Sequence, residues 1–372
     1  MSSAIQTSAR TPLPEGEEAG SVPTTRGKGE AARKPTARDP YFDNAKYFAI
    51  LLVVMGHVWP AVIEGSRATR GLYMLVYTFH MPVFILVSGY LSRSYTGRPD
   101  QLKRLLTGVV VPYVVFEVAY TLFTRWGTDT FRSISLLHPT YLMWFLIALF
   151  IWRLTTPFWR VVRWPLATSL VIATLASVTP AIGGTLEMSR VLQFLPFFVL
   201  GLSMKPEHFV FLRRRPVRIA SVLVFAAAIP LLYWLTPTLY LSWFYRSQSV
   251  QEMGVGVWWG LFIAGILFLC TLVLTAAFLS LVPGSRRWFT ALGAGTICGY
   301  VLHGFVIRGL SYLGLFEDNP WLATAPGRVV VTLAALVVMT LLCTPLVRRA
   351  LKWVTEPEMA WAFRKDAPAK QA

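Results

Sequence analysis

The 372-residue sequence is strongly apolar, with 55% hydrophobic residues, 14% charged residues and a mean hydropathy of +0.54. A soluble chain of this length carries more charge, so the composition excludes an ordinary soluble enzyme and indicates a membrane protein. The net charge of +17 does not predict nucleic-acid binding, because the basic residues lie between apolar runs rather than beside aromatic platforms. The three cysteines lie inside apolar runs without paired spacing, which predicts neither a disulfide nor a metal site.

The chain divides into a polar start, a long apolar body and a short polar end. Residues 1–40 are rich in small, polar and charged residues without apolar periodicity, and we expect a disordered cytoplasmic tail. They are not a signal peptide, because no apolar stretch follows the first charges. Residues 41–352 are expected to form one membrane domain, and residues 353–372 a cytoplasmic C-terminal tail.

The apolar runs predict an all-α, polytopic bundle of about ten transmembrane helices, since only helices satisfy their own backbone within lipid. With the N-terminus inside, the loops assigned to the cytoplasm hold at least as many basic residues as the opposite loops. This pattern predicts a multi-pass plasma-membrane protein with both termini in the cytoplasm. The expected spans are roughly 44–63, 71–92, 104–124, 138–157, 164–181, 190–204, 217–236, 255–282, 291–314 and 327–348.

The first span carries a cation and a histidine on the same face. Lys46 and His57 stand eleven residues apart, which brings their side chains to within roughly 20° around the helix and separates them by roughly 16 Å along it. Lys46 is therefore expected at a membrane surface and His57 near the middle of the bilayer. An ionisable group at that depth is costly and marks a candidate functional site.

Three further ionisable residues are expected at the depth of His57. At about 1.5 Å per residue, His80, Glu117 and His303 each reach the middle third of the bilayer in the second, third and ninth spans. Each alone could be a core residue satisfied by a neighbouring hydroxyl or carbonyl. Together, four groups from four helices favour a shared polar cavity.

A basic loop follows the second span and includes Arg93, Lys103 and Arg104. Its charges satisfy the positive-inside rule, and that is the simpler interpretation for most of them. Beside Lys46, the same loop could hold the phosphates of a cytosolic cofactor. The sequence lacks the glycine-rich phosphate loops of soluble nucleotide enzymes, so phosphate binding would rely on side-chain charge.

Several segments together resemble one known family. YFDNAK and VVMGH in the first span, then FHMPVFILVSGYL at 79–91, are similar to the opening helices of the acyltransferase-3 family. The likeness extends through KRLLTGVVVPY, YLMWFLIALFIWRL, FLPFFVLGL and GTICGYVLHGFVIR, from about residue 39 to 350. These proteins are integral-membrane O-acyltransferases that modify sugars and cell-surface glycans, and the nearest branch is the fucose 4-O-acetylase-like one.

The resemblance implies transfer of an acyl group, most often acetyl, from acyl-CoA to a hydroxyl of a sugar or glycan. Lys46 and His57 match the family's basic residue and histidine in the first helix, although many members carry Arg at the first position. His57 is expected to act as the general base on the acceptor hydroxyl. Asp43, His80 and Glu117 are the candidates to orient His57. The candidates to bind acyl-CoA are Lys46, Arg93, Lys103 and Arg104, and the candidates to bind substrate are Trp144 and His303.

Acyl-CoA is expected to be a donor substrate rather than a tightly bound cofactor, and direct transfer is favoured because no activated serine or cysteine is apparent. Ser88, for example, lacks the surrounding glycines of a hydrolase nucleophile elbow. A proton-coupled transporter is the alternative, since membrane-embedded His and Glu residues also serve as proton relays. The absence of an internal repeat in the spans weighs against it. A non-catalytic scaffold would not need polar groups at one depth.

Overall fold

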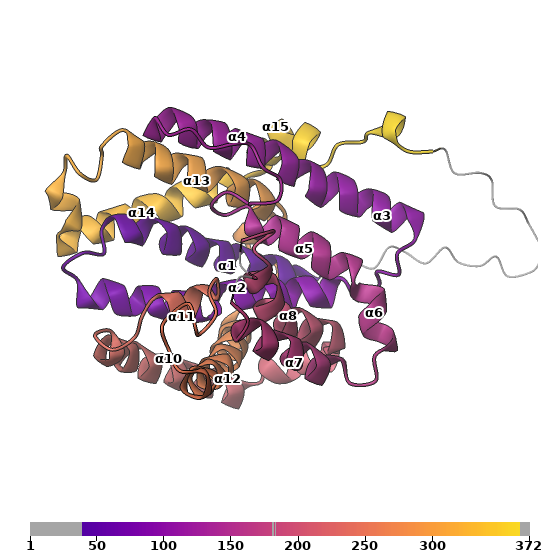
Figure 1. Ribbon diagram of the computed structural model, residues 1–372, viewed down its shortest axis with the longest axis horizontal. Helices are drawn as coiled ribbons and strands as arrows, with labels where there is room; N and C mark the ends of the chain where they lie inside the picture. The colour runs from indigo at the N-terminus through magenta and orange to yellow at the C-terminus, as the bar shows by residue number, and fades with distance from the viewer. Residues whose placement is uncertain (1–38, 181, 183, 365–372) are drawn as a thin grey trace, which may run out of the picture. The chain divides into compact units, whose positions relative to one another are not determined.

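The computed structural model describes residues 39–180, 182 and 184–364, which form a bundle of α-helices (Figure 1). These described residues contain no β-strand, which confirms the predicted all-α class. Residues 1–38 of the predicted N-terminal tail and 365–372 of the predicted C-terminal tail lie outside the described residues. The longer helices are α1 (Pro40–Val58), α2 (Arg67–Leu91), α4 (Val111–Thr128), α5 (Trp144–Leu154), α7 (Pro165–Ser177), α8 (Met188–Ser203), α10 (Arg215–Leu235), α12 (Val257–Leu281), α13 (Thr296–Tyr312), α14 (Ala325–Leu342) and α15 (Pro345–Thr355).

Shorter helical pieces connect these helices. They are α3 (Pro99–Leu105), α6 (Thr156–Val161), α9 (Pro206–Leu212) and α11 (Ser242–Tyr245), the 3₁₀ turns η1 (Trp59–Ala61), η3 (Trp288–Ala294), η4 (Pro320–Ala323) and η5 (Ala360–Ala362), and the π-helical turn η2 (Leu106–Val110). α3, η2 and α4 run without interruption from Pro99 to Thr128. This rod is drawn at the top of Figure 1.

Five helical segments are long and apolar enough to cross a membrane, and the number rises to seven if each bent pair is one span. The two bent pairs are α8 with α9, at 101°, and η3 with α13, at 78°. Each of the ten predicted spans overlaps a helix. Among the described residues, fewer than ten helices are long and apolar enough to cross a membrane, because α5 and α7 are short and α1 carries Asp43, Lys46 and other polar residues.

The centre of the bundle is formed by α1 and α2, which lie between α13 and α14 on one side and α10 and α12 on the other (Figure 1). In the most apolar window of α2, 72% of the residues are buried, against 11% in α10 and 22% in each of α12 and α14. The outer helices therefore expose apolar side chains, as expected for surfaces that face lipid rather than water.

Two glycines allow α2 and α8 to touch backbone to backbone. A Cβ atom at Gly89 would lie 2.2 Å from the carbonyl oxygen of Phe198, and one at Gly201 would lie 2.1 Å from that of Leu86. Small residues permit such close approach between membrane helices. The contact fixes the spacing of two helices that both line the site described below.

The start of α1 is fixed by a buried asparagine that sequence reasoning did not single out. The Asn44 side-chain amide donates to the carbonyl oxygens of Pro283 and Ser285 at 2.8 and 3.0 Å. Its oxygen accepts from the Thr290 hydroxyl at 2.7 Å. These three bonds hold α1 against the segment that precedes α13. They thereby fix the position of α1, and with it Lys46 and His57, relative to α13.

Candidate functional site

A pair of histidines lies at the centre of the bundle. The rings of His57 on α1 and His303 on α13 have centroids 5.1 Å apart. Within the described part of the chain, neither ring nitrogen of His57 makes a hydrogen bond. The short distance between the rings confirms the prediction that His57 and His303 share one layer of the bundle. Because neither nitrogen of His57 is engaged by the described residues, the neutral ring keeps one that can accept a proton.

The hydrogen bonds of His80 and His303 fix the tautomers of these two rings. A carbonyl oxygen can only accept, so Nδ1 of His303 donates to Gly299 at 3.0 Å and Nδ1 of His80 donates to Val76 at 2.7 Å. In the neutral ring, Nε2 of each then carries a lone pair. Nε2 of His303 is buried and has no hydrogen-bond partner among the described residues. A buried polar atom without a partner calls for an explanation, such as a functional role or a bound molecule.

A cavity of about 320 Å³ opens onto His57 and His80, and it is called the His57 cavity below. Aromatic side chains from five helices and from the segment before α5 form most of its wall. Its hydroxyls are linked in places, since those of Tyr73 and Tyr245 lie 2.8 Å apart. The lining is Val53, His57, Pro60, Tyr73, Tyr77, His80, Met81, Tyr141, Leu142, Trp144, Arg190, Phe194, Phe244, Tyr245 and Tyr300.

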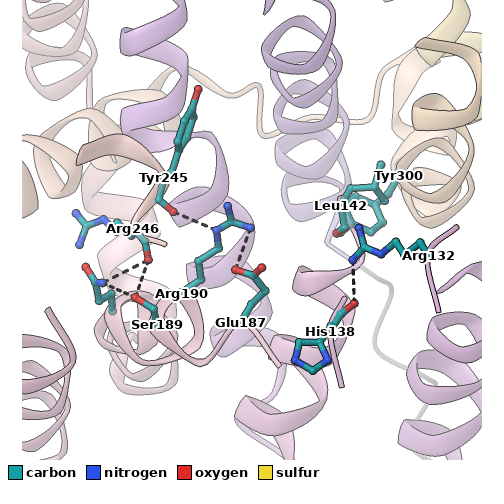
Figure 2. A network of polar contacts seen from close by, with 10 residues as sticks. Arg132, His138, Leu142, Glu187, Ser189, Arg190, Tyr245, Arg246 and Tyr300 are labelled. Carbon is teal, nitrogen blue, oxygen red and sulfur yellow. Dashed lines mark hydrogen bonds and ion pairs between the residues drawn. The ribbon is translucent and has the colours of Figure 1, made fainter. Parts of the chain in front are cut away.

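One cation, Arg190 at the start of α8, lines this cavity (Figure 2). Its Nη1 lies 3.3 Å from a carboxylate oxygen of Glu187, and its Nε donates to the carbonyl of Tyr245 at 3.3 Å. The guanidinium also lies 5.4 Å from the centre of the Trp144 ring. Trp144, predicted to bind substrate, therefore lines the same cavity as His57 and stands beside a fixed positive charge.

Tyr141 contacts His57 from a strained backbone position. The two ring centroids are 5.0 Å apart in an edge-on arrangement, and the guanidinium of Arg308 covers the Tyr141 ring at 4.1 Å. Tyr141 has a φ of +57°, in the left-handed region that is uncommon for residues other than glycine. The predicted span 138–157 is thus helical only from Trp144, because the preceding residues turn into the cavity.

Glu117 supports this turn instead of contacting a histidine. Its carboxylate accepts from the Thr140 backbone N–H at 2.8 Å and from the Thr140 hydroxyl at 2.5 Å. It is 1% exposed, as its predicted depth requires, but it does not line the His57 cavity. Glu117 is therefore linked to the His57 cavity through Thr140, the residue before Tyr141.

Asp43 lies at the opposite end of α1 from His57. Fourteen residues separate the two, or about 21 Å of helix, which is too far for direct contact. The structure instead brings Asp43 to Lys46, whose ammonium lies 2.8 Å from the carboxylate. The interpretation of Asp43 as a residue that orients His57 is therefore replaced by an ion pair that holds Lys46.

Lys46 lines a second cavity, of about 290 Å³, called the Lys46 cavity below. Apart from Lys46, its polar lining includes Ser88, Arg153 and Glu356, and most of the remaining wall is aliphatic or aromatic. Val53, Met81 and Tyr300 line both this cavity and the His57 cavity. The two cavities therefore adjoin, with the cation in one and the histidine in the other.

Tyr300 forms part of the boundary between the cavities. Its hydroxyl donates to the backbone carbonyl of Leu142, in the same segment as Tyr141 (Figure 2). Sequence reasoning missed Tyr300, although it stands three residues before His303 on the same face of α13, a spacing that pairs side chains on a helix. It also missed Arg190 and Tyr141, since neither lies at a predicted mid-membrane position.

The predicted basic loop does not act as one unit in the structure. Arg104 lines a polar pocket together with Arg153. Arg93 instead lies over the ring of Tyr90, 3.5 Å from its centre, and Lys103 lies 5.1 Å from the centre of the Phe363 ring. Neither Arg93 nor Lys103 lines the Lys46 cavity.

The chain is thus a helical bundle with segments long and apolar enough to cross a membrane, and its cation and histidine line adjoining cavities. A model of the acyltransferase-3 family, described as an acyltransferase domain, matches residues 39–348. The chain belongs to this family, which confirms the resemblance seen in the sequence and, at the level of the family, the expectation of a membrane acyltransferase.

Two curated relatives are both nodulation proteins named NolL. The chain is 30% identical over 194 residues to the protein of Mesorhizobium japonicum and 27% identical over 190 residues to that of Sinorhizobium fredii. Each match covers 47% of this chain and 50% of the relative, so the chain spans about half the length of the curated relatives it matches. No solved structure matches the chain.

Proposed function

We propose that this protein transfers an acyl group, with acetyl as the first candidate, from acyl-CoA to a hydroxyl of a sugar or glycan. The observation that carries the proposal is the pair of adjoining cavities: Lys46 lines one, His57 lines the other, and Tyr300 lines both. Direct transfer between two substrates requires that donor and acceptor meet at one point. The junction beside Val53 and Met81 supplies such a point.

The Lys46 cavity suits the donor. Acyl-CoA is anionic at its nucleotide end, and the cavity carries two cations, Lys46 and Arg153. Its apolar wall suits the thin pantetheine arm, which would carry the thioester toward Tyr300. Acyl-CoA acts here as a substrate that is consumed, without a tightly bound cofactor.

The His57 cavity suits a sugar. Aromatic rings give flat surfaces for the apolar faces of a sugar ring, while tyrosine hydroxyls and Arg190 offer hydrogen bonds to its oxygens. Trp144 lies in this wall beside Arg190, which supports its predicted part in substrate binding.

The proposed chemistry is a single displacement at the thioester. A ring nitrogen of His57 removes the proton of the acceptor hydroxyl while the hydroxyl oxygen forms a C–O bond to the thioester carbonyl carbon. The C–S bond then breaks, and the departing thiolate takes the proton from the His57 imidazolium to leave as CoA–SH. His303, whose ring centre lies 5.1 Å from that of His57, would stabilise that imidazolium through its Nε2 lone pair, and His80 would help to position the acceptor in the same cavity.

For the membrane arrangement, we keep the predicted ten crossings, with both termini in the cytoplasm and the chain in the plasma membrane. The proposal is supported by the overlap of every predicted span with a helix and by the positive-inside charge pattern. In this orientation Lys46 and the end of α5 face the cytosol, where acyl-CoA is found.

The test is transfer of radiolabel from acetyl-CoA by the purified full-length protein in detergent, with a membrane-glycan extract as acceptor. Wild-type protein is expected to label the glycan, and His57→Ala is expected not to, while both proteins bind CoA. Transfer that is undiminished in His57→Ala would show that His57 is not the base. If wild-type protein neither transfers acetyl nor binds acetyl-CoA, the acyltransferase proposal fails and the proton-coupled transporter becomes the better explanation.

A further inference from the structure

We propose that a polar pocket between the α2–α3 loop and the end of α5 binds a phosphate group of the acyl-CoA donor, with Arg153 and Arg104 as its cations and Tyr95 as a hydroxyl donor. This inference rests on the proposed function and adds a binding subsite to it. The pocket, called the Tyr95 pocket below, has a volume of about 260 Å³. It is lined by Leu91, Ser92, Ser94, Tyr95, Gln101, Arg104, Leu105 and Arg153.

The Tyr95 pocket adjoins the donor side of the site. Arg153 lines both this pocket and the Lys46 cavity, and Tyr300 in turn lines both the Lys46 cavity and the His57 cavity. Shared lining residues therefore place the pocket, the Lys46 cavity and the His57 cavity in a series of neighbours. A molecule with a phosphate at one end and a thioester at the end of a long arm matches this series.

Arg153 supplies a positive charge that is partly withdrawn from water. Its Nε donates to the Ser92 hydroxyl at 3.2 Å, and that hydroxyl donates to the carbonyl of Ser88 at 2.7 Å. Within the described part of the chain, the Arg153 guanidinium makes no ion pair with a carboxylate. The fixed Nε leaves the two terminal nitrogens available for the paired contacts that guanidinium makes with phosphate.

Tyr95 adds an independent reason to expect a ligand. Its side chain is 8% exposed, and its hydroxyl is enclosed without a hydrogen-bond partner among the described residues. Burial raises the pKa of Tyr95, with a smaller opposing effect from Arg153, so the hydroxyl keeps its proton and remains a donor. A buried donor without a partner destabilises a fold, and a phosphate oxygen would remove that cost.

The loop that carries Tyr95 is held in place by the side chain of Gln101. The Gln101 carbonyl oxygen accepts from the backbone N–H of Thr96 at 2.7 Å, and its amide donates to the carbonyl of Ser94 at 2.9 Å. Both bonds fix the backbone on either side of Tyr95. The pocket is therefore preformed, and the donor would not have to order the loop on binding.

Arg98, from the same loop, offers a matched control. Its side chain is 66% exposed, its Nε lies 3.3 Å from the Asp100 carboxylate, and it does not line the pocket. A loss of function caused merely by removing positive charge from the loop would appear in Arg98→Gln as well as in Arg153→Gln. A specific phosphate contact would appear only in Arg153→Gln, Arg104→Gln and Tyr95→Phe.

The experiment compares two donors that differ in their phosphates, acetyl-CoA and acetyl-pantetheine, using the full-length protein in detergent. For acetyl-CoA, we expect KM to rise by about tenfold or more in Arg153→Gln and by about threefold in Tyr95→Phe, because charged contacts exceed neutral ones. Arg104, which is exposed, should give a smaller rise. For acetyl-pantetheine, which has no phosphate, all of these variants should match wild type, and Arg98→Gln should match wild type with both donors.

Binding of CoA and of 3′-dephospho-CoA, measured by calorimetry, makes the result independent of the acceptor. A wild-type preference for CoA that is lost in Arg153→Gln would assign the pocket to the 3′-phosphate; equal weakening of both ligands would assign it to the diphosphate.

Equal KM increases with acetyl-CoA and acetyl-pantetheine would overturn the inference while leaving acyl transfer intact, as would unchanged binding of both ligands in Arg153→Gln. Wild-type protein that uses neither donor and binds neither ligand would overturn the proposed function and the inference together. Thermal unfolding of each variant checks that the fold is kept.

Discussion

The Lys46 cavity and the His57 cavity are similar in volume, about 290 and 320 Å³, but their walls differ in kind. The Lys46 cavity is mainly aliphatic with charges at its polar edge, whereas aromatic rings, hydroxyls and imidazoles surround the His57 cavity. The difference fits the two substrates proposed above: a thin arm with a charged end in the Lys46 cavity, and a compact polar body in the His57 cavity. Size alone would not have separated these two cavities.

The strongest test of this comparison is to remove the base from one cavity and leave the other unchanged. His57→Gln should lower kcat by about 10²–10⁴, the range typical of a lost general base, because glutamine cannot accept the proton. The Kd for CoA, measured by calorimetry, should stay near the wild-type value, since His57 does not line the Lys46 cavity. A large change in the Kd for CoA would mean that the two cavities are not separate sites.

Removing the cation from the Lys46 cavity should change donor affinity. Lys46→Gln should raise KM for acetyl-CoA by about tenfold to a hundredfold, the value of a charge-assisted contact of about 1.5–3 kcal/mol. Lys46→Arg is the matched control, because it retains the charge beside Asp43 and should stay within a few-fold of wild type. If Lys46→Gln only lowers thermal stability, the role of Lys46 is limited to its ion pair with Asp43.

A change at Arg190 should affect acceptor binding alone. Arg190→Lys retains the charge but loses the forked geometry that contacts both Glu187 and the carbonyl of Tyr245. We expect KM for the acceptor to rise by about threefold to tenfold, consistent with one lost hydrogen bond. Steady-state kinetics with each substrate varied in turn checks this, and an equal rise in KM for acetyl-CoA would contradict the assignment of Arg190 to the acceptor side.

The smallest catalytic effect is expected at Glu117. Glu117→Gln should destabilise the protein by about 1–3 kcal/mol, because the amide cannot accept both the N–H and the hydroxyl of Thr140 as well as a carboxylate does. A thermal-shift midpoint several degrees below wild type, with kcat changed by less than about tenfold, is the expected result. A loss of kcat as large as that in His57→Gln would instead place Glu117 directly in the reaction.

The sequence predicted well what depends on distance along a helix. His57, His80 and His303 were expected at one depth, because each residue adds a fixed rise of about 1.5 Å, and the structure brings them to one layer. Glu117 shows the limit of that reasoning. It lies buried as expected, but the direction it faces depends on how its helix is wound, and the π-helical turn Leu106–Val110 precedes it. One extra residue in such a turn rotates everything after it by about 100°.

Tyr141 and Tyr95 could not have been predicted from periodicity, because both lie outside regular helices. Tyr141 enters the His57 cavity from a turn in the left-handed region, and Tyr95 lies in the loop after α2. The pairing of Asp43 with Lys46, by contrast, was within reach of the sequence, since a spacing of three residues puts the two side chains on one face of α1.

The backbone contact between α2 and α8 has a consequence for motion. The contact at Gly89 and Gly201 leaves no side chain between the helices that could rearrange. We therefore expect α2 and α8, which carry His80 and Arg190 of the same cavity, to move together. An opening between donor and acceptor sides during turnover is then expected at the wall formed by Tyr300, which is joined to the Leu142 backbone by one hydrogen bond from its hydroxyl.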